Sequence, residues 1–243
     1  MPTCCPVLEL RRYALHPGAR DTLIRLFDKE FVETQEAVGM RIVGQFRDLD
    51  EPDRFVWVRG FADMASRAQG LAAFYGGPVW KAHAAEANAT MVDSDDVLLL
   101  RPVDAGAGFR LDGLARPPAG ATGAPESLVV ATICHRAAPV DDDFLAFFHR
   151  DVAPVLAGTG GAALARLRTE YAENTFPALP VRTGEHVFVW FARFTGEDDY
   201  REHADRLAQH PEWPDRILPE LLSRLSAAPQ RLRLAPTARS LLR

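Results

Sequence analysis

Two stretches of the chain read almost alike. Residues 55–61 are Phe-Val-Trp-Val-Arg-Gly-Phe, and residues 188–194 are Phe-Val-Trp-Phe-Ala-Arg-Phe. All four tryptophans of the chain pair at one spacing of 133 residues, Trp57 with Trp190 and Trp80 with Trp213. Because tryptophan is this scarce, the shared spacing predicts an internal repeat, and a repeat determines the architecture.

Upstream of this block the spacing between the copies is shorter. Pro17 pairs with Pro139 and Leu26 with Phe148, each 122 residues apart. The second copy would therefore have gained 11 residues. Residues 170–184, which are rich in Pro, Gly and Asn, are predicted to form the long loop that holds them.

Each copy shows the same predicted order of elements, βαββαβ, which is the ferredoxin-like arrangement. In the first copy a second helix begins after Asp63, breaks at Gly76 and Gly77, and restarts at Pro78. The predicted elements of the first copy are strands 7–15, 40–47, 54–61 and 96–101 with helices 19–38 and 63–88. Those of the second copy are strands 128–136, 162–170, 186–194 and 230–235 with helices 141–157 and 197–226, the latter broken at Pro211.

These elements predict an α+β protein of two tandem ferredoxin-like units. A unit of this kind leaves one face of its sheet uncovered, and two units in one chain can cover each other. We therefore expect the units to pack sheet to sheet as an intrachain dimeric α/β barrel. The first unit is expected at residues 1–103, a linker rich in Gly, Ala and Pro at 104–127, and the second unit at 128–243.

Composition excludes several classes of protein. The 243 residues carry a formal net charge of −5, which gives no general attraction to nucleic acid. No apolar run approaches the length that spans a membrane, and residues 1–6 lack the basic and apolar regions of a secretory signal. The three cysteines, Cys4, Cys5 and Cys134, indicate neither a disulfide framework nor a metal site. We expect a cytoplasmic protein.

Several motifs resemble the NIPSNAP family of the dimeric α/β-barrel superfamily. They are Glu9-Leu10-Arg11-Arg12-Tyr13, Pro17-Gly18, Trp57, Pro78-Val79-Trp80 and Leu99-Leu100-Arg101-Pro102. The second copy keeps Trp190 and Pro211-Glu212-Trp213 but has Ala131-Thr132-Ile133-Cys134-His135 in place of the first-strand motif. The resemblance implies likeness to small cofactor-free oxygenases, cyclases and heme-dependent enzymes, which is an argument by analogy of fold.

Alternation along two central strands predicts a polar cluster in the first copy. Glu9, Arg11 and Tyr13 share one face of the first strand, as Trp57, Arg59 and Phe61 share one face of the third. Guanidiniums and a phenol beside an indole suit a planar or anionic ligand. We predict catalytic roles for Tyr13, Arg59 and Glu9 and substrate binding by Arg11, Trp57, Phe61, His135 and Trp190. The alternative is that Glu9 and the arginines only satisfy each other.

The second copy offers a mostly apolar counterpart. From the spacing, its equivalent residues are Ala131, Ile133, His135, Trp190 and Ala192. We therefore expect any small-molecule pocket to be lined mainly by the first copy. No histidine or cysteine spacing predicts a metal site, and no cofactor is expected. A heme bound through His149 is the alternative.

Three functions remain open from the sequence. The first is a NIPSNAP-like, cofactor-independent small-molecule enzyme of oxygenase or cyclase type, acting by acid–base chemistry on an aromatic or polyketide-like substrate in biosynthesis. The others are a non-catalytic small-molecule-binding or stress-response protein and an interaction scaffold. The expected partner is a planar or anionic small molecule, not nucleic acid or a membrane, and self-association stays open.

Overall fold

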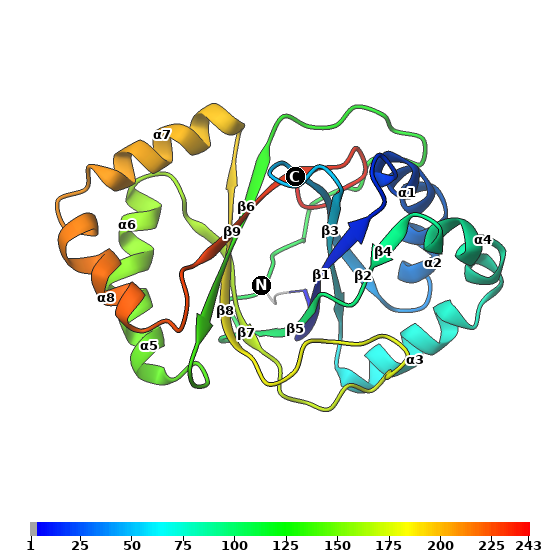
Figure 1. Cartoon of the computed structure of the whole chain (residues 1–243), viewed down its shortest axis with the longest axis horizontal. Helices are drawn as coiled ribbons and strands as arrows, with labels where there is room; N and C mark the ends of the chain where they lie inside the picture. Colours follow the sequence, from blue (N-terminus) through cyan, green and yellow to red (C-terminus); the bar gives the residue numbers. More distant parts are fainter. Residues whose placement is uncertain (1–3) are drawn as a thin grey trace.

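A closed antiparallel sheet dominates the computed structural model, which describes residues 4–243 (Figure 1). Its strands follow the order β3-β2-β9-β6-β8-β7-β5-β1-β4, and β1 also pairs with β3, so eight strands of the described chain close into a barrel. The strands are β1 Val7–Leu15, β2 Arg41–Asp48, β3 Arg54–Phe61, β4 Met91–Asp93, β5 Val97–Pro102, β6 Leu128–Arg136, β7 Ala163–Thr169, β8 His186–Phe194 and β9 Gln230–Pro236.

Helices cover the outside of the barrel in two groups (Figure 1). The group formed from residues 20–88 packs over β1, β2, β3 and β5, and the group formed from residues 142–223 packs over β6, β7 and β8. The elements are α1 Arg20–Leu26, η1 Phe27–Phe31, α2 Val32–Glu36, α3 Met64–Tyr75, α4 Pro78–Asn88, α5 Asp142–Phe147, η2 Phe148–Val152, α6 Ala153–Gly158, α7 Glu197–Ala208, η3 Trp213–Ile217 and α8 Leu218–Ser223. We call residues 7–102 the first half and residues 128–236 the second half.

The two halves join edge to edge. Hydrogen-bonded pairing of β2 with β9 and of β5 with β7 makes the eight strands one continuous wall. The barrel that the sequence predicts is thus present, and its two sheets are joined along both edges as well as packed across the interior.

Apolar side chains from both halves fill the barrel. Inward-facing residues such as Leu10, Val58 and Ile133 belong to one buried cluster, as alternation along each strand requires. Phe109 and Leu111, from the segment predicted to be only a linker, lie in the same cluster. The interior is therefore a packed core, and the functional groups must be sought outside the barrel, under the helices.

Local signals in the sequence locate many element boundaries. The predicted strands 54–61, 128–136 and 186–194 match β3, β6 and β8, and residues 170–185 form the long loop between β7 and β8. Helix α3 ends at Tyr75 and α4 begins at Pro78, while the Asp63 side chain accepts a hydrogen bond from the Ser66 N–H as an N-cap. The three π-helical turns and the short β4 lack a local signature and were not predicted.

One predicted register is wrong by a residue. Arg11 lies opposite Trp57, and Thr132 lies opposite Trp190, so the first strands of the halves are offset by 121 residues and not 122. Because side chains alternate, a one-residue slip exchanges the two faces of a strand. The counterparts of Glu9, Arg11 and Tyr13 are therefore Val130, Thr132 and Cys134, whereas Ala131 and Ile133 point into the barrel.

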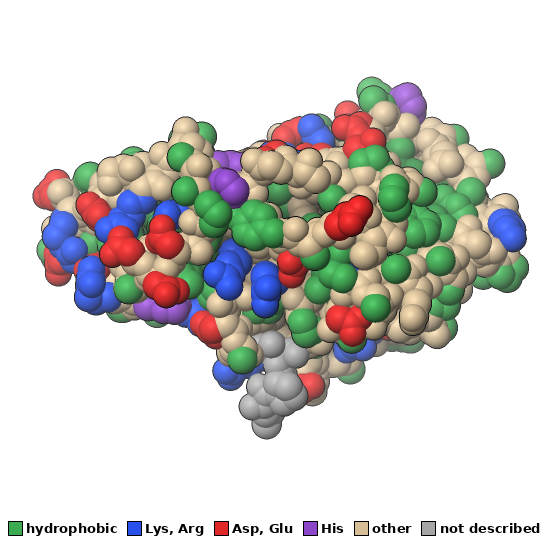
Figure 2. All heavy atoms as spheres, turned by 90° about the horizontal axis from the view of Figure 1, so that it is seen from below, with side chains coloured by type: hydrophobic (Ala, Val, Ile, Leu, Met, Phe, Trp, Pro, Cys, Tyr) green, Lys and Arg blue, Asp and Glu red, His purple; other side chains and the backbone are tan. Residues whose placement is uncertain are grey.

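The surface and the cysteines add two observations. On the face seen in Figure 2, acidic and basic side chains are interspersed and do not gather into one basic patch. Cys4 and Cys5 are bonded to each other in a disulfide that closes no loop of the chain, while Cys134 is a buried free thiol.

Among residues 4–243, no helix is both long and apolar enough to cross a membrane.

Candidate functional site

The residues predicted on β1 and β3 lie together on the outer face of the barrel, beneath the helices of the first half. Glu9 is opposite Arg59, and Arg11 is opposite Trp57. Both arginines, the glutamate and the tryptophan are at most 2% exposed, and Tyr13 is 7% exposed. Strand alternation therefore brings this predicted group together, under α3 and the α1–α2 helix.

Glu9 accepts charge-assisted hydrogen bonds from three arginines. Its carboxylate lies 2.8 Å from Arg11 Nη1, 2.7 Å from Arg59 Nε and 2.7 Å from Arg67 Nε. Arg67 comes from α3 and was not singled out in the sequence, where nothing marks a helical arginine as buried. We call Glu9, Arg11, Arg59 and Arg67 the arginine cluster.

Other parts of the chain close over this cluster. Arg59 Nη1 donates to Gln35 Oε1 at 3.1 Å, and Arg11 Nε donates to the Tyr13 hydroxyl at 3.0 Å. Arg67 Nη1 donates at 2.9 Å to Asn174 Oδ1, which belongs to the long β7–β8 loop of the second half. This loop thus reaches across and shields the arginine cluster from solvent.

The electrostatics of the cluster are unbalanced. Burial by itself would raise the pKa of Glu9, but Arg59, Arg11 and Arg67 outweigh it and hold that pKa well below its usual range. Burial raises the pKa of Tyr13, so its phenol stays neutral at pH 7. Three guanidiniums thus face one carboxylate, and two positive charges remain in excess.

The first half leaves little free space beside these groups. A cavity of about 30 Å³, which we call the first-half cavity, lies between the sheet and the helices. Its lining includes Tyr13, Gln35, Trp57, Tyr75 and Trp80. Arginine and aromatic side chains fill most of the remaining volume.

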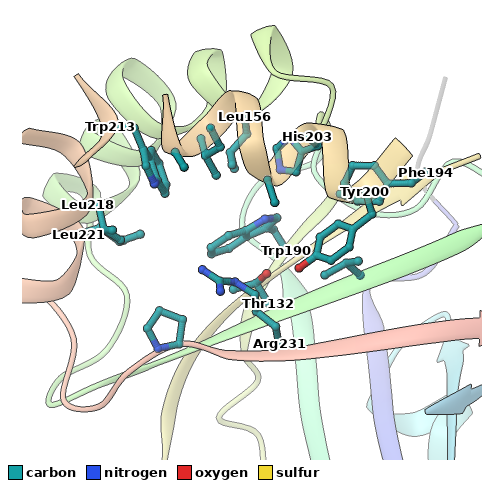
Figure 3. A pocket seen from close by; sticks show the side chains of 17 residues that line it. Thr132, Leu156, Trp190, Phe194, Tyr200, His203, Trp213, Leu218, Leu221 and Arg231 are labelled. Carbon is teal, nitrogen blue, oxygen red and sulfur yellow. The ribbon is translucent and has the colours of Figure 1, made fainter. Parts of the chain in front are cut away.

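The corresponding space in the second half is open. A cavity of about 240 Å³, the second-half cavity, lies between the outer face of β6, β8 and β9 and the helices α6, α7 and α8 (Figure 3). Aromatic side chains form much of its wall, and Trp190 lies near its centre in Figure 3. The aromatic lining residues are Trp190, Phe194, Tyr200, His203 and Trp213.

Side-chain size explains the difference between the halves. At corresponding places the first half has Glu9, Arg11, Arg59 and Tyr75, whereas the second half has Val130, Thr132, Ala192 and Ala208. Removing this volume leaves the larger cavity. The larger of these two cavities is therefore lined by the second half, whereas the pocket was expected in the first copy; which half binds a small molecule stays a prediction.

The polar groups of the second-half cavity are free to meet a ligand. Within residues 4–243, the guanidinium of Arg231 has neither an ion pair nor a hydrogen-bond partner, and it stands beside Thr132 and Trp190 (Figure 3). Arg231 is exposed, so its charged guanidinium stays in contact with water at the cavity mouth. An unpaired guanidinium beside an indole is suited to a planar anion.

His203 supplies a second reactive group. Its Nδ1 lies 3.2 Å from the Thr159 carbonyl oxygen, which can only accept, so Nδ1 carries the proton and Nε2 is left as an acceptor. Burial lowers the pKa of His203, which keeps the ring neutral at pH 7. Gly161 lies against the ring, and a Cβ there would come within 2.6 Å of Nε2.

The remaining predicted residues have different places. Trp190 lines the second-half cavity, whereas His135 lies outside it, with Nδ1 3.5 Å from a Glu185 carboxylate oxygen. His149 is exposed on η2 and does not line that cavity. Arg231, Tyr200 and His203 were missed as site residues because strand β9 and helix α7 carry no motif that marks them.

Comparison with known proteins supports the fold. No curated protein matches the chain. The chain is similar to a presumed monooxygenase from Fusobacterium nucleatum, with a TM-score of 0.57 and 10% identity over 96% of this chain and 93% of that one. An anthrone oxidase-like protein gives a TM-score of 0.55 and 12% identity over 95% and 91% of the two chains. A presumed monooxygenase from Lactobacillus acidophilus gives 0.53 and 14% over 96% and 94%. At such identities the likeness shows the fold alone.

The family assignment rests on the first half. The motifs from Glu9 to Pro102 lie on β1, in the turn that follows it, and on β3, α4 and β5, and they supply Glu9 and Arg11 of the arginine cluster. The sequence profile described as NIPSNAP matches residues 8–105, a range that contains all of these elements. Residues 8–105 thus match the NIPSNAP family model, and the whole chain is a mixed α/β protein with an eight-stranded antiparallel barrel-like sheet.

Proposed function

We propose that the second-half cavity binds a compact planar aromatic molecule with an acidic group, and that the protein is a cofactor-independent enzyme acting on it by acid–base and oxygen chemistry. The observation that carries this proposal is the unpaired Arg231 guanidinium at the mouth of an aromatic cavity. The names of the structural neighbours, two presumed monooxygenases and an anthrone oxidase-like protein, are in keeping with it.

Binding would use the shape and charge of the cavity. Its volume of about 240 Å³ is below the roughly 300–1,000 Å³ of pockets for drug-sized ligands, which restricts the ligand to a compact molecule. Trp190 and Trp213 offer flat apolar surfaces. Arg231 would stabilise a phenolate or enolate oxygen more strongly than the neutral form, and so lower the cost of deprotonation.

The chemistry would begin at His203. Its neutral ring accepts a proton from an acidic CH₂ group flanked by aromatic rings, and Arg231 holds the negative charge on the conjugated oxygen. The carbanion transfers an electron to O₂ and combines with it at carbon, and the peroxide takes the proton back. Loss of water leaves a ketone, so the balance is R₂CH₂ + O₂ → R₂C=O + H₂O. O₂ is the oxidant, and the CH₂ group of the substrate supplies the electrons.

A hydroxylated anthrone tests this proposal directly. We expect 1,8-dihydroxyanthrone to be converted to the anthraquinone with uptake of one equivalent of O₂, measured by oxygen electrode and absorbance in the presence of a metal chelator. Arg231→Gln should weaken binding by up to about 5-fold, since an ion pair of a solvent-exposed arginine contributes about 0–1 kcal/mol. His203→Gln should lower kcat by about 10²–10⁴-fold while binding persists.

Two further variants provide the controls. Arg233→Gln changes an arginine of the same strand that pairs with Asp50 at 2.6 Å and does not line the cavity, so binding should be unchanged. Ala192→Leu should fill the cavity and abolish binding while the protein stays folded, because Ala192 lines it and is 5% exposed. Undiminished binding by Ala192→Leu would refute the location of the site.

A second candidate is a protein that binds such a molecule without converting it. This reading requires only the aromatic walls of the second-half cavity and the Arg231 guanidinium, which bind a planar anion without any proton transfer. In that case the anthrone and its anthraquinone would both bind with Arg231-dependent affinity, and no O₂ would be consumed above the rate without protein.

We also infer that the two halves are duplicated ferredoxin-like units, with bounds near 1–103 and 128–243 and a connecting segment between them. The strand orders β5-β1-β3-β2 and β9-β6-β8-β7 are equivalent, and α3 and α7 have the same length of 12 residues. Residues 1–3 of the first unit lie outside the described residues. Expression of 128–243 alone as a folded dimer would support this inference.

A further inference from the structure

The arginine cluster of the first half has an unmet requirement for negative charge. Arg11, Arg59 and Arg67 are 1%, 0% and 0% exposed, and Glu9 is the carboxylate that pairs with all three. Buried charges are stable when counterions meet them, because burial removes the screening of water. Tyr13 is a neutral phenol at pH 7 and cannot supply that charge.

Three buried donors of the same region make no hydrogen bond within the described chain: Trp57 Nε1, Arg59 Nη2 and Arg67 Nη2. Arg67 Nη2 still lies 2.7 Å from a Glu9 carboxylate oxygen, which leaves Trp57 Nε1 and Arg59 Nη2 without an acceptor. Two guanidiniums lie close to the indole ring of Trp57, with Arg59 Cζ 4.9 Å and Arg11 Cζ 5.6 Å from its centroid. An uncharged water could accept from these donors, but it would not balance the two excess positive charges.

The available space selects a small occupant. Trp57, Tyr13 and Gln35, the acceptor of Arg59, line the first-half cavity, whose volume of about 30 Å³ exceeds the roughly 10–15 Å³ that one water molecule needs. A planar aromatic molecule does not fit there. Asn174 and Thr175 of the β7–β8 loop both accept from Arg67, and Phe176 stacks on Tyr75 with ring centroids 5.9 Å apart, so this loop separates the region from solvent.

We propose that the first half holds a small monovalent anion, of the size of a halide, beside Trp57 and the arginine cluster. The anion accepts from the Trp57 indole N–H and from Arg59, and it balances part of the excess charge left by Glu9. This site is separate from the aromatic cavity of the second half, so the failure of either proposal leaves the other standing.

Halide binding by the full chain tests the proposal. The melting temperature would be measured in sodium gluconate, with chloride or bromide replacing gluconate at constant ionic strength. A specific site gives a rise that saturates with halide concentration, because a ligand that binds only the folded state stabilises it in proportion to the logarithm of 1 + [L]/Kd. Trp57→Phe keeps the ring and removes the N–H, and it should weaken the fitted Kd by about 10-fold.

The chain offers a matched control. Trp190→Phe makes the same change at the corresponding place in the second half, which lacks the arginine cluster, and it should leave the halide response unchanged. Wild-type crystals soaked in sodium bromide should show an anomalous peak within hydrogen-bond distance of Trp57 Nε1. The proposal would be overturned if the melting temperature rose without saturation, and equally, in wild type and both variants and no such peak appeared. If Trp57→Phe does not fold, the crystal experiment decides.

Discussion

Replacing Glu9 by Gln should be one of the most destabilising single changes in the chain. Glu9 is 0% exposed and accepts from three guanidiniums at 2.7–2.8 Å. A glutamine keeps one acceptor oxygen, removes the negative charge, and directs an amide N–H₂ at groups that can only donate. Removing one partner of a buried ion pair costs about 3–5 kcal/mol. For a chain of this length, that corresponds to a fall in Tm of roughly 6–20 °C.

Urea unfolding followed by circular dichroism, in buffer free of halide, measures this effect. Glu185→Gln is the control, because its partner Arg182 is 26% exposed and an exposed pair contributes only about 0–1 kcal/mol. A loss below about 1 kcal/mol for Glu9→Gln would refute the argument that this carboxylate neutralises the cluster.

The same residue also predicts a pH dependence. The pKa of Glu9 is lowered in the folded protein. As the pH falls below the ordinary glutamate pKa, Glu9 therefore binds a proton in the unfolded chain before it does so in the folded chain. The stabilisation is complete above the ordinary glutamate pKa of about 4.3 and is lost as the pH falls below it. The free energy of unfolding of wild type should therefore decrease more steeply below pH 5 than that of Glu9→Gln, and parallel curves would contradict this.

Two further predictions concern the second half. Burial lowers the pKa of His203, so the stability that this residue contributes is present above the ordinary histidine pKa of about 6.5 and is lost as the pH falls below it. Urea midpoints at pH 7.5 and 5.5 should differ less for His203→Gln than for wild type, and an equal difference would show that the ring protonates freely in the fold. Burial also raises the pKa of Cys134 to about 12, and this thiol is 0% exposed, so iodoacetamide at pH 8 should label it only after urea is added. Rapid labelling of the native protein, detected by mass spectrometry, would contradict its burial.

Local patterns in the sequence carried the prediction of the elements. Runs of alternating or continuous apolar residues located β3, β6 and β8, and the Gly-Gly-Pro break located the junction between α3 and α4. Alternation also placed Glu9, Arg11 and Tyr13 on one face of β1, opposite Trp57 and Arg59 on β3. These features depend on the geometry of one strand or one turn, which neighbouring residues determine.

The candidate sites depended on contacts that neighbouring residues do not determine. Arg67 completes the arginine cluster only because α3 packs over β1, 58 residues away in the chain. The β7–β8 loop was predicted as a loop, but its contact with Arg67 crosses from one half to the other. A one-residue error in the offset between β1 and β6 sufficed to assign Ala131 and Ile133 to the wrong face.

The sequence by itself determined the repeated order of strands and helices and the face on which the arginine cluster forms, because spacing and alternation are properties of the chain. Only the tertiary structure decided that the two halves join edge to edge, that the barrel is filled, and that the larger cavity beneath the helices lies in the second half. The physical reason is that a cavity is the part of the space between sheet and helices that the side chains do not fill. The spacing of 133 residues already sets Arg59 against Ala192 and Tyr75 against Ala208, but only the packing of helices on the sheet shows that this difference in side-chain volume leaves a cavity.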